Sequence, residues 1–404
     1  MCPGLTKMRL ISHCNRSLTF HTLEATEVKP FFNWTKEVRI NMTKPLPLIQ
    51  QAGFILLNDA RLLFRNPLGK NVGDSIAWKA NDDSYIVQKS SQPQGQHWKE
   101  PTVEERMMRC TGPVPSLVYT FNSWFVGNYG HYLHDHLPII AWLREIMPAH
   151  ALLVMVKSAV HAQIIDSVDA KFALKRIHAL EFNKLACASE ARLVVQPYHP
   201  WRHQGLVRPL RNWIRPFSPT PVSPATEPKA VAIFYSRLKA PSIRHGRFMV
   251  PEHEEAILNL TRSKMDSALK GIRSSLEVYN GHLADGVPMP IVQQAALFES
   301  ASFVIGPHGS GLANIVWLPN LMPHLPPRKL ASSARNADTE RDCLHRPRVL
   351  EFLCGVRSEV VQSGCPFGRS YWNLFALARW VEYHHIVFAR NSSEKSTWVR
   401  LDEL

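Results

Sequence analysis

The amino-acid sequence predicts an α/β protein built from two globular domains. With 404 residues, the chain exceeds what one hydrophobic core usually organises. Its composition of 45% apolar and 20% charged residues argues against disorder. Short apolar runs alternate with segments of helical periodicity, which is typical of a doubly wound parallel sheet. We therefore expect two α/β domains, preceded by a short strand-rich N-terminal extension.

The first half of the chain changes its hydrophobic pattern near residue 110. Residues 1–110 carry short apolar runs separated by Gly, Pro, Asn and Asp, which predicts a region rich in strands and turns. Residues 111–210 are expected to form the first α/β domain, because their predicted elements make a βαβ unit and a further strand. These elements are strands at 116–121, 151–156 and 191–197 and a helix at 128–147.

The second α/β domain is expected at residues 229–370, after a Pro-rich linker at 211–228. Six prolines lie from Pro209 to Pro228, and the stretch SPTPVSPATEP suits an extended segment better than a helix or a central strand. Helical patterns separate strands predicted at 230–236, 275–281, 302–306 and 349–355. Residues 371–404 are expected to form a closing helix and strand.

Charge and cysteine spacing exclude some classes of function. The chain carries 47 Lys and Arg against 33 Asp and Glu, and the formal net charge of +14 favours anionic partners. The basic residues are scattered and form no basic and aromatic cluster, so we expect a phosphate site and no nucleic acid partner. The seven cysteines lack zinc-ligand spacing. Cys343, Cys354 and Cys365 lie close enough for a local disulfide in an oxidising compartment.

Five Asn-x-Ser/Thr sequons favour the secretory pathway, meaning the lumen of the Golgi or endoplasmic reticulum. They lie at Asn15, Asn33, Asn41, Asn259 and Asn391. The last three residues, Asp402, Glu403 and Leu404, match the ER retrieval tetrapeptide. The N-terminus has no apolar signal core, and no stretch approaches the about 18 to 20 apolar residues of a membrane span. We expect no transmembrane segment, and either a soluble protein or one whose signal or anchor is missing from this sequence.

A glycine-rich turn, GPHGSGLAN, is the first candidate for chemistry. It follows an apolar strand and leads into a helix expected at 312–318, so it lies at the carboxyl edge of the sheet, where α/β proteins bind ligands. Its glycines let the backbone approach a ligand, and the helix N-terminus attracts an anion such as a diphosphate. The candidate ligand-binding residues are Gly306, His308, Gly309, Ser310, Gly311, Leu312 and Asn314. The alternative is a glycine-rich connection that binds nothing.

Polar side chains share one face of the helix predicted after the first strand. At α-helical spacing, Asn128, His131 and Asp135 fall within about 60° of one another. His131 and Asp135 can hydrogen-bond, which orients the imidazole and suits the pair to general-base work on a hydroxyl. The alternatives are a solvated helix start and a metal site that includes His134 and His136. Those two histidines point away from the Asn128 face, so we expect a base rather than a metal site.

Arginines follow the first strand of the second domain. Arg237 ends that strand, and Arg244 and Arg247 follow in the loop. Arginine binds phosphate in a bidentate manner. Surface arginines are common, but these lie near the sheet edge that also carries Gly309, so we expect Arg237 and Arg247 to contact the same phosphate.

In chain order, the histidine-containing helix, the arginine loop and the glycine-rich turn together resemble glycosyltransferase family 61, over about residues 121–388. FESASFVIGPHGSGLANIVWLP is similar to the family's His-Gly-Ala-Gly-Leu-(Thr/Ser)-Asn sequence after a buried strand, with Ser310 and Ala313 as its two departures. GNYGHYLHDHLP resembles the family's Asn-x-x-His-x-x-x-Asp helix. SRLKAPSIRHGRFMVPEHEE resembles its Ser-Arg…Arg-Ile-x-Asn-Glu segment, with Pro251 where Asn is usual. EFLCG matches a family Glu with Glu351, and YWNLFALARWVEYHHIVF resembles the closing helix and strand.

The resemblance implies a GT-B architecture, in which two Rossmann-like doubly wound domains face a cleft. The acceptor would bind to the N-terminal domain and the donor to the C-terminal one, and the final helix would cross back to the first domain. It also implies an inverting glycosyltransferase that moves a pentose or N-acetylglucosamine from a UDP-sugar to a hydroxyl of a glycan or glycoprotein. No divalent metal is expected to take part.

In this interpretation Asp135, or the His131 and Asp135 pair, deprotonates the acceptor hydroxyl. Charge on the departing diphosphate is met by the helix N-terminus after Gly311, by His308 and by Arg237. Asn128 would position the donor or acceptor sugar. Two alternatives stay open: a catalytically inactive nucleotide- or glycan-binding protein of the same fold, and a metal-dependent phosphoesterase built on the histidine-rich helix.

Overall fold

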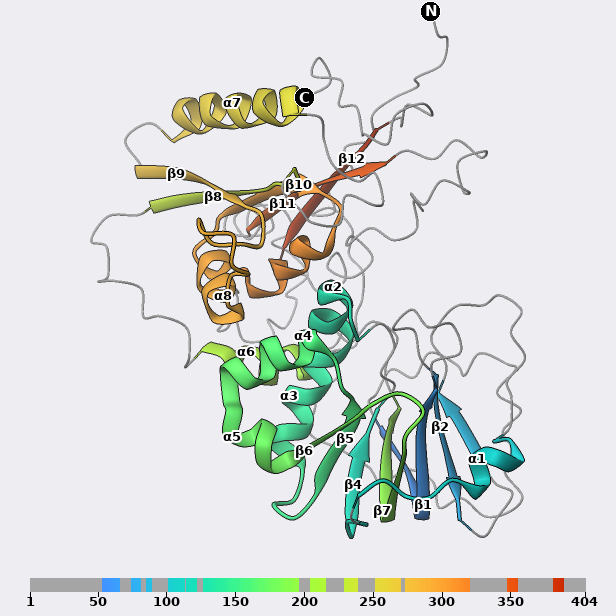
Figure 1. The fold of residues 1–404 in the computed structure, drawn as a ribbon. Helices are drawn as coiled ribbons and strands as arrows, with labels where there is room; N and C mark the ends of the chain where they lie inside the picture. Colours follow the sequence, from blue (N-terminus) through green and yellow to red (C-terminus); the bar gives the residue numbers. More distant parts are fainter. Residues whose placement is uncertain are drawn as a thin grey trace, which may run out of the picture. The chain divides into compact units, whose positions relative to one another are not determined.

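The computed structural model describes twelve stretches of the chain, which form two compact units (Figure 1). These stretches are residues 53–65, 74–80, 85–88, 101–112, 114–121, 126–195, 204–215, 229–238, 251–269, 273–319, 347–354 and 381–388. The first unit contains the described residues up to 215, and the second contains those from 229 onward. Each unit is built on one β-sheet with helices, so the predicted α/β class is confirmed.

The first unit is built on a seven-stranded sheet whose strand order is β3-β2-β1-β7-β4-β5-β6. Its strands are β1 (Gly53–Arg65), β2 (Asp74–Lys79), β3 (Tyr85–Gln88), β4 (Leu117–Thr120), β5 (Leu152–Val156), β6 (Ile177–Leu180) and β7 (Leu185–Val195). Strands β6, β5, β4 and β7 are parallel. In chain order they read 3-2-1-4, which is the order found in half of a Rossmann sheet.

Strands β1 to β3 correct the expectation of a separate N-terminal extension. β1 pairs antiparallel with β7 from Gly53↔Val195 to Leu63↔Leu185, and β2 and β3 follow as antiparallel neighbours. Buried apolar residues alternate along β1, where Leu62 and Leu63 enter two different hydrophobic clusters. Because β1 pairs with β7 and contributes buried residues to both clusters, β1 to β3 belong to the sheet of the first unit.

The helices of the first unit are short and partly π-helical. They are α1 (Val103–Met107), α2 (Tyr129–His131), η2 (Tyr132–His136), α3 (Leu137–Ile146), α4 (Ala159–His161), η3 (Ala162–Asp166), α5 (Ser167–Arg176) and α6 (Gln204–Ile214), where η2 and η3 are π-helical turns. The single helix expected at 128–147 is therefore divided into α2, η2 and α3. Within the described stretches, no helix has the length and hydrophobicity needed to cross a membrane.

Helix α6 shortens the predicted linker. It contains Pro209 in its interior and ends at Ile214, inside the range expected to be extended. Leu206, Val207 and Leu210 are buried on the face that packs against α3, and this burial offsets the hydrogen bond that the proline removes. The rest of the predicted linker, residues 216–228, lies outside the described residues.

The second unit is built on a parallel five-stranded sheet whose order is β12-β11-β10-β8-β9. Its strands are β8 (Lys229–Tyr235), β9 (Arg273–Tyr279), β10 (Phe303–Pro307), β11 (Arg348–Cys354) and β12 (Glu382–Phe388), and its helices are α7 (Pro251–Ala268), α8 (Ile291–Glu299) and the 3-10 helix η7 (Ser310–Trp317). In chain order the strands read 5-4-3-1-2, the flavodoxin-like form of a doubly wound sheet. The four strands predicted between 230 and 355 are confirmed.

Strand β12 belongs to the second sheet, which corrects the predicted domain end at residue 370. It pairs in parallel with β11 from Arg348↔Glu382 to Cys354↔Phe388. The helix predicted immediately before β12 lies outside the described residues. The second sheet therefore extends to Phe388.

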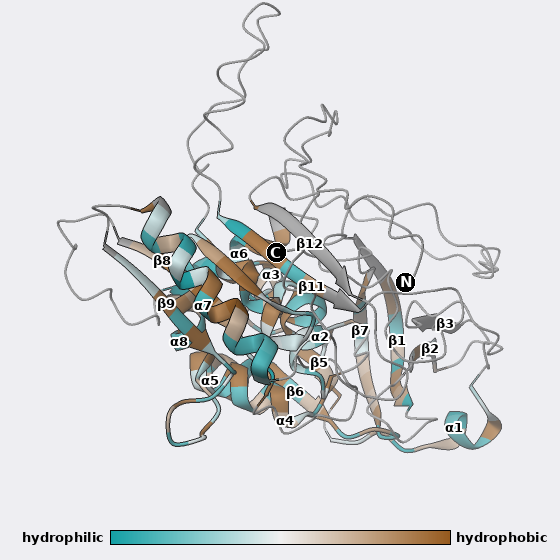
Figure 2. Cartoon of the chain, turned by 90° about the horizontal axis from the view of Figure 1, so that it is seen from above, coloured by the Kyte–Doolittle hydropathy of each residue, from teal (hydrophilic) through white to brown (hydrophobic). Residues whose placement is uncertain are grey.

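Helices α7 and α8 cover opposite faces of the second sheet (Figure 1). Ile257 of α7 packs with Phe234, Ile305 and Phe352 on one face. Phe298 of α8 packs edge to face on a β9 tyrosine on the other, with ring centroids 5.1 Å apart. Both helices carry hydrophobic and hydrophilic residues along their length, as Figure 2 shows. The sheet is thus covered by one helix layer on each face.

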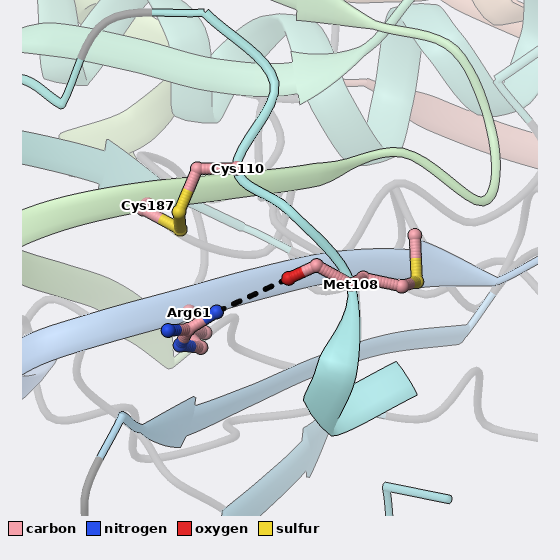
Figure 3. The surroundings of a disulfide bond; sticks show 4 residues. All are labelled: Arg61, Met108, Cys110 and Cys187. Atoms are coloured by element: carbon pink, nitrogen blue, oxygen red, sulfur yellow. Dashed lines mark hydrogen bonds between the residues drawn. A yellow bond between two sulfur atoms is a disulfide. The ribbon is translucent and has the colours of Figure 1, made fainter. Parts of the chain in front are cut away.

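A disulfide between Cys110 and Cys187 joins the segment after α1 to β7 (Figure 3). The two cysteines lie 77 residues apart in sequence, and the guanidinium of Arg61 donates to the carbonyl oxygen of Met108 close by. Sequence spacing did not identify this pair, because the partners meet only where the segment after α1 lies beside β7. A local disulfide was expected among Cys343, Cys354 and Cys365, and of these Cys343 and Cys365 lie outside the described residues.

Candidate functional site

The second sheet changes direction between β8 and β10. The next strand in the chain after β8, which is β9, lies on one side of β8, and β10 lies on the other side. The carboxyl ends of β8 and β10 therefore mark a topological switch point. Ligands of open α/β sheets bind at such points. Arg237 follows β8 and His308 follows β10, and Nη1 of Arg237 donates to the carbonyl oxygen of His308 over 2.8 Å. The structure therefore joins these two predicted residues at the expected edge of the sheet.

His308 is held at both its backbone and its side chain. Its N–H donates to the carbonyl oxygen of Phe352, and its imidazole Nδ1 lies 2.5 Å from Oε1 of Glu351. The carboxyl group of Glu351 is fully buried, while the imidazole keeps 18% of its surface exposed. The pair places an oriented imidazole, backed by a buried carboxylate, at the switch point.

The glycines of the turn are required by two close neighbours, Tyr235 and Arg237, which is a reason that the sequence did not predict. A Cβ on Gly306 would lie 2.7 Å from Cβ of Tyr235, and a Cβ on Gly311 would overlap the tyrosine ring. A Cβ on Gly309 would lie 2.9 Å from Nη1 of Arg237. These distances are below normal contact, so no larger residue fits unless its neighbours move. The glycines alone therefore do not indicate a bound ligand.

Tyr235 also uses one of the backbone donors expected for an anion. The N–H of Gly311 donates to the Tyr235 hydroxyl over 3.2 Å. Burial raises the pKa of Tyr235, and its interactions with Arg237 and Gly311 only partly oppose that effect. The hydroxyl therefore stays protonated, and the tyrosine supports the turn from the side of the sheet.

The helix after the turn is a 3-10 helix that starts at Ser310, two residues before the start predicted from the sequence. Its Asn314 is fully buried, and its side-chain amide donates to the Tyr279 hydroxyl and to Oε1 of Gln294 over 2.9 and 2.8 Å. Leu312 is fully buried as well. We therefore assign Asn314 and Leu312 to the packing of this helix, rather than to direct contact with a donor as the sequence predicted.

Glu254 is a polar residue near this edge that sequence reasoning did not single out. It lies in the first turn of α7, is 5% exposed, and shares a side-chain hydrogen bond with Ser236, which follows β8. Burial raises the pKa of Glu254, and the hydrogen bond from Ser236 opposes this effect. No sequence signal distinguishes it from neighbouring glutamates, because burial depends on the packing of α7. The predicted Arg247, and Arg244 with it, lie outside the described residues.

The first unit carries its candidate residues after β4, at the carboxyl end of a strand next to its own switch point. Asn128 caps α2, because its Oδ1 accepts a hydrogen bond from the N–H of His131. Its side-chain oxygen is thus used in starting the helix. This gives Asn128 a structural role that the predicted sugar contact did not include.

Asp135 lies between two imidazoles. Its Oδ2 is 2.8 Å from Nδ1 of His131, as the predicted pair requires, and its Oδ1 is 2.7 Å from Nδ1 of His134. The involvement of His134 corrects the sequence analysis, which placed this residue on another face by assuming α-helical steps. The chain here follows a π-helical turn with i→i+5 hydrogen bonds, which changes the angles between side chains.

The environment of Asp135 keeps its carboxylate charged. Burial raises the pKa of Asp135, but the two histidines outweigh burial and hold this pKa well below its ordinary value. The ligand atoms of His131, His134 and Asp135 lie within 4.8 Å of one another. His136 is not part of this cluster, because its ring is buried near Phe121 and Tyr132 with centroids 5.6 Å from each.

A buried hydrogen bond joins the π-helical turn η2 to helix α4. The Tyr132 hydroxyl lies 2.7 Å from Nδ1 of His161, which joins η2 to the end of α4. Burial holds the pKa of Tyr132 well above its ordinary value, with a smaller effect of Asp166 in the same direction. Burial lowers the pKa of His161, against an opposing effect of Asp166. The tyrosine hydroxyl is therefore the donor and the neutral histidine is the acceptor.

Comparison with solved structures gives weak similarities. A dodecameric iron-containing heptosyltransferase, TibC, in complex with ADP-D-beta-D-heptose shows 12% identity and a TM-score of 0.24, over 67% of this chain and 75% of that one. TibC from enterotoxigenic E. coli H10407 shows 14% identity and a TM-score of 0.26, over 65% and 72%. At these scores neither similarity supports an assignment. A comparison with curated proteins gives no match.

The family comparison is specific. The model of the family described as Glycosyltransferase 61 matches residues 129–324. This range begins at α2 and extends past η7, so it contains the cluster around Asp135 and the turn around His308. It also spans parts of both sheets. Residues 129–324 therefore belong to glycosyltransferase family 61, and the chain is a glycosyltransferase.

Proposed function

We propose that this glycosyltransferase has a GT-B architecture and moves a pentose or N-acetylglucosamine from a UDP-sugar to a hydroxyl of a glycan or glycoprotein. The configuration at the anomeric carbon of the sugar is inverted in the transfer. One observation carries the proposal: His308, oriented by the buried Glu351, meets Arg237 at the switch point of the second sheet. A guanidinium, together with an imidazole that can donate from Nε2 when it is protonated, suits the diphosphate of a nucleotide-sugar at such an edge.

The donor diphosphate is the group that these residues would stabilise. Negative charge grows on the diphosphate as the bond to the sugar breaks, and preorganised donors lower the energy of that state. Arg237 is fixed by its hydrogen bond to the His308 carbonyl, and His308 is fixed by Glu351. The side chain of Ser310 and the first N–H groups of η7 would complete the contact. Arg247 would add a second guanidinium.

In the first unit, His131 is proposed as the base, with Asp135 as the residue that orients it. Both carboxylate oxygens of Asp135 face an imidazole Nδ1, so the hydrogen of each neutral ring is held at Nδ1. The basic nitrogen of His131 is then Nε2, which would take the proton of the acceptor hydroxyl as the oxygen attacks the anomeric carbon. This chemistry requires no divalent metal.

The lumen of the Golgi or endoplasmic reticulum is the proposed location. The Cys110–Cys187 disulfide supports an oxidising compartment. The sequon at Asn259 lies on an exposed position of α7, while the other four sequons lie outside the described residues. These features, together with the family's acceptors, favour a glycoprotein or glycan acceptor.

The test is a transfer assay with the purified chain, UDP-GlcNAc, UDP-xylose and UDP-arabinose. His131→Gln is expected to lower the rate by about 100- to 10,000-fold, the usual effect of general-base catalysis. His150→Gln, at an exposed histidine of the same unit, is the matched control and should keep the parental rate. Undiminished transfer by His131→Gln would remove this residue from the base role. Donor binding without any transfer would support an inactive binding protein instead.

A further inference from the structure

The cluster of His131, His134 and Asp135 has the composition of a transition-metal site. Two imidazoles and one carboxylate present ligand atoms within 4.8 Å of one another. Imidazole nitrogen and carboxylate oxygen are both ligands of Zn²⁺, and three protein ligands leave a fourth position for water. Softer thiolate ligands are not needed for such a site.

The distances within the cluster can fit a metal after the side chains move by about an ångström. Each Asp135 oxygen lies 2.7 or 2.8 Å from one imidazole Nδ1. Bonds from zinc to nitrogen or oxygen measure about 2.0 to 2.2 Å, so ligand atoms around a tetrahedral zinc lie about 3.3 to 3.5 Å apart. Each hydrogen-bonded nitrogen and oxygen would need to separate by about half an ångström. Ligand atoms as far apart as 4.8 Å would need to approach by about 1.3 to 1.5 Å, and side-chain torsions can supply both shifts. Solvent reaches the cluster mainly at His131, which is 29% exposed.

We propose that these three residues bind Zn²⁺ and that the bound metal inhibits transfer. The inference rests on the proposed role of His131 as the base. A neutral imidazole that coordinates zinc through Nδ1 carries its hydrogen on Nε2. This hydrogen moves from Nδ1 to Nε2 through solvent, so the ring loses no proton overall. With Nε2 protonated, His131 has no lone pair for the acceptor hydroxyl.

The experiment measures binding of Zn²⁺ to the full chain by calorimetry, without donor or acceptor. The parent and His150→Gln should each bind one equivalent. His134→Gln removes one ligand and leaves the His131–Asp135 hydrogen bond in place, and it should bind more than about 10-fold more weakly. Asp135→Asn is the second variant, and circular dichroism checks that both remain folded. Equal binding by the parent and His134→Gln would overturn the site, as would the absence of stoichiometric binding to the parent.

A transfer assay then tests inhibition. Stoichiometric Zn²⁺ should abolish transfer by the parent, and a chelator should restore the rate. Stoichiometric binding that leaves the rate unchanged would overturn the inhibitory role. The two proposals can fail separately: a chain that transfers sugar but binds no zinc contradicts only this inference. A chain that binds zinc at the cluster but transfers nothing contradicts only the proposed function.

Discussion

The imidazole of His308 is hydrogen-bonded to the buried carboxylate of Glu351, with Nδ1 and Oε1 2.5 Å apart. Glu351 is paired in register with Gly306 across β10 and β11, so the strand pairing itself brings the two side chains together. A buried carboxylate without a partner would be costly. The contact therefore links the stability of this sheet edge to the orientation of the imidazole.

Glu351→Gln is expected to lower transfer by about 10- to 100-fold, because the amide keeps an oxygen for Nδ1 but removes the charge that orients and stabilises a protonated imidazole. Initial rates with a labelled UDP-sugar measure the effect. Glu277→Gln, at an exposed position on β9, is the matched control and should keep the parental rate. A parental rate in Glu351→Gln would separate this pair from catalysis.

Gly311→Ala is expected to destabilise the second unit by about 1 to 3 kcal/mol, the usual effect of overpacking a well-filled site. The added Cβ would overlap the ring of Tyr235. Urea unfolding measures the change. In a Tyr235→Ala background the ring is absent, so the same substitution should cost much less. Equal costs in both backgrounds would show that the tyrosine does not select this glycine.

Removing the disulfide is expected to destabilise the first unit by about 2 to 5 kcal/mol. The double variant Cys110→Ser and Cys187→Ser releases a link between residues 77 positions apart. Thermal unfolding of the parent and the variant measures the loss. Peptide mapping without reductant should show the two cysteines in one linked pair, and a different pairing would contradict the structure.

The stability of the first unit is expected to fall as the pH drops below about 6.5, the ordinary pKa of histidine. Burial lowers the pKa of His161 in the folded chain, against an opposing effect of Asp166. The unfolded chain therefore binds more protons below this pH, and protonation also removes the acceptor of the Tyr132 hydroxyl. Urea unfolding at pH 7.5 and pH 5.5 tests the fall, which should be smaller in His161→Gln. An equal fall in both chains would contradict the role of His161.

Much of the second unit was predictable from the sequence, because β8, β10 and β11 are short apolar runs with a polar or glycine boundary. The turn at His308 was found because it follows such a run. Its pairing with Glu351 and Arg237 depends on strand order, which the sequence does not contain. The contact of the glycines with Tyr235 could not be predicted, since this residue lies about 70 residues away in sequence and meets them only across the sheet.

The first unit was less predictable. The pairing of β1 with β7 joins segments more than 120 residues apart, and neither has a local signal for the other. The π-helical turn at η2 is not predictable from α-helical periodicity, because its i→i+5 hydrogen bonds change the angle between successive side chains. His134, the residue immediately before Asp135, also contacts the carboxylate, so the expected pair is part of a three-residue cluster. The sequence therefore identified the residues of this cluster but not their arrangement.

The most direct test of the proposed inverting transfer is the anomeric configuration of the product, followed by proton NMR during the reaction. With an α-linked UDP-sugar such as UDP-GlcNAc or UDP-xylose, single displacement predicts that the first product formed is the β-glycoside. A product that forms with the α configuration would contradict the account.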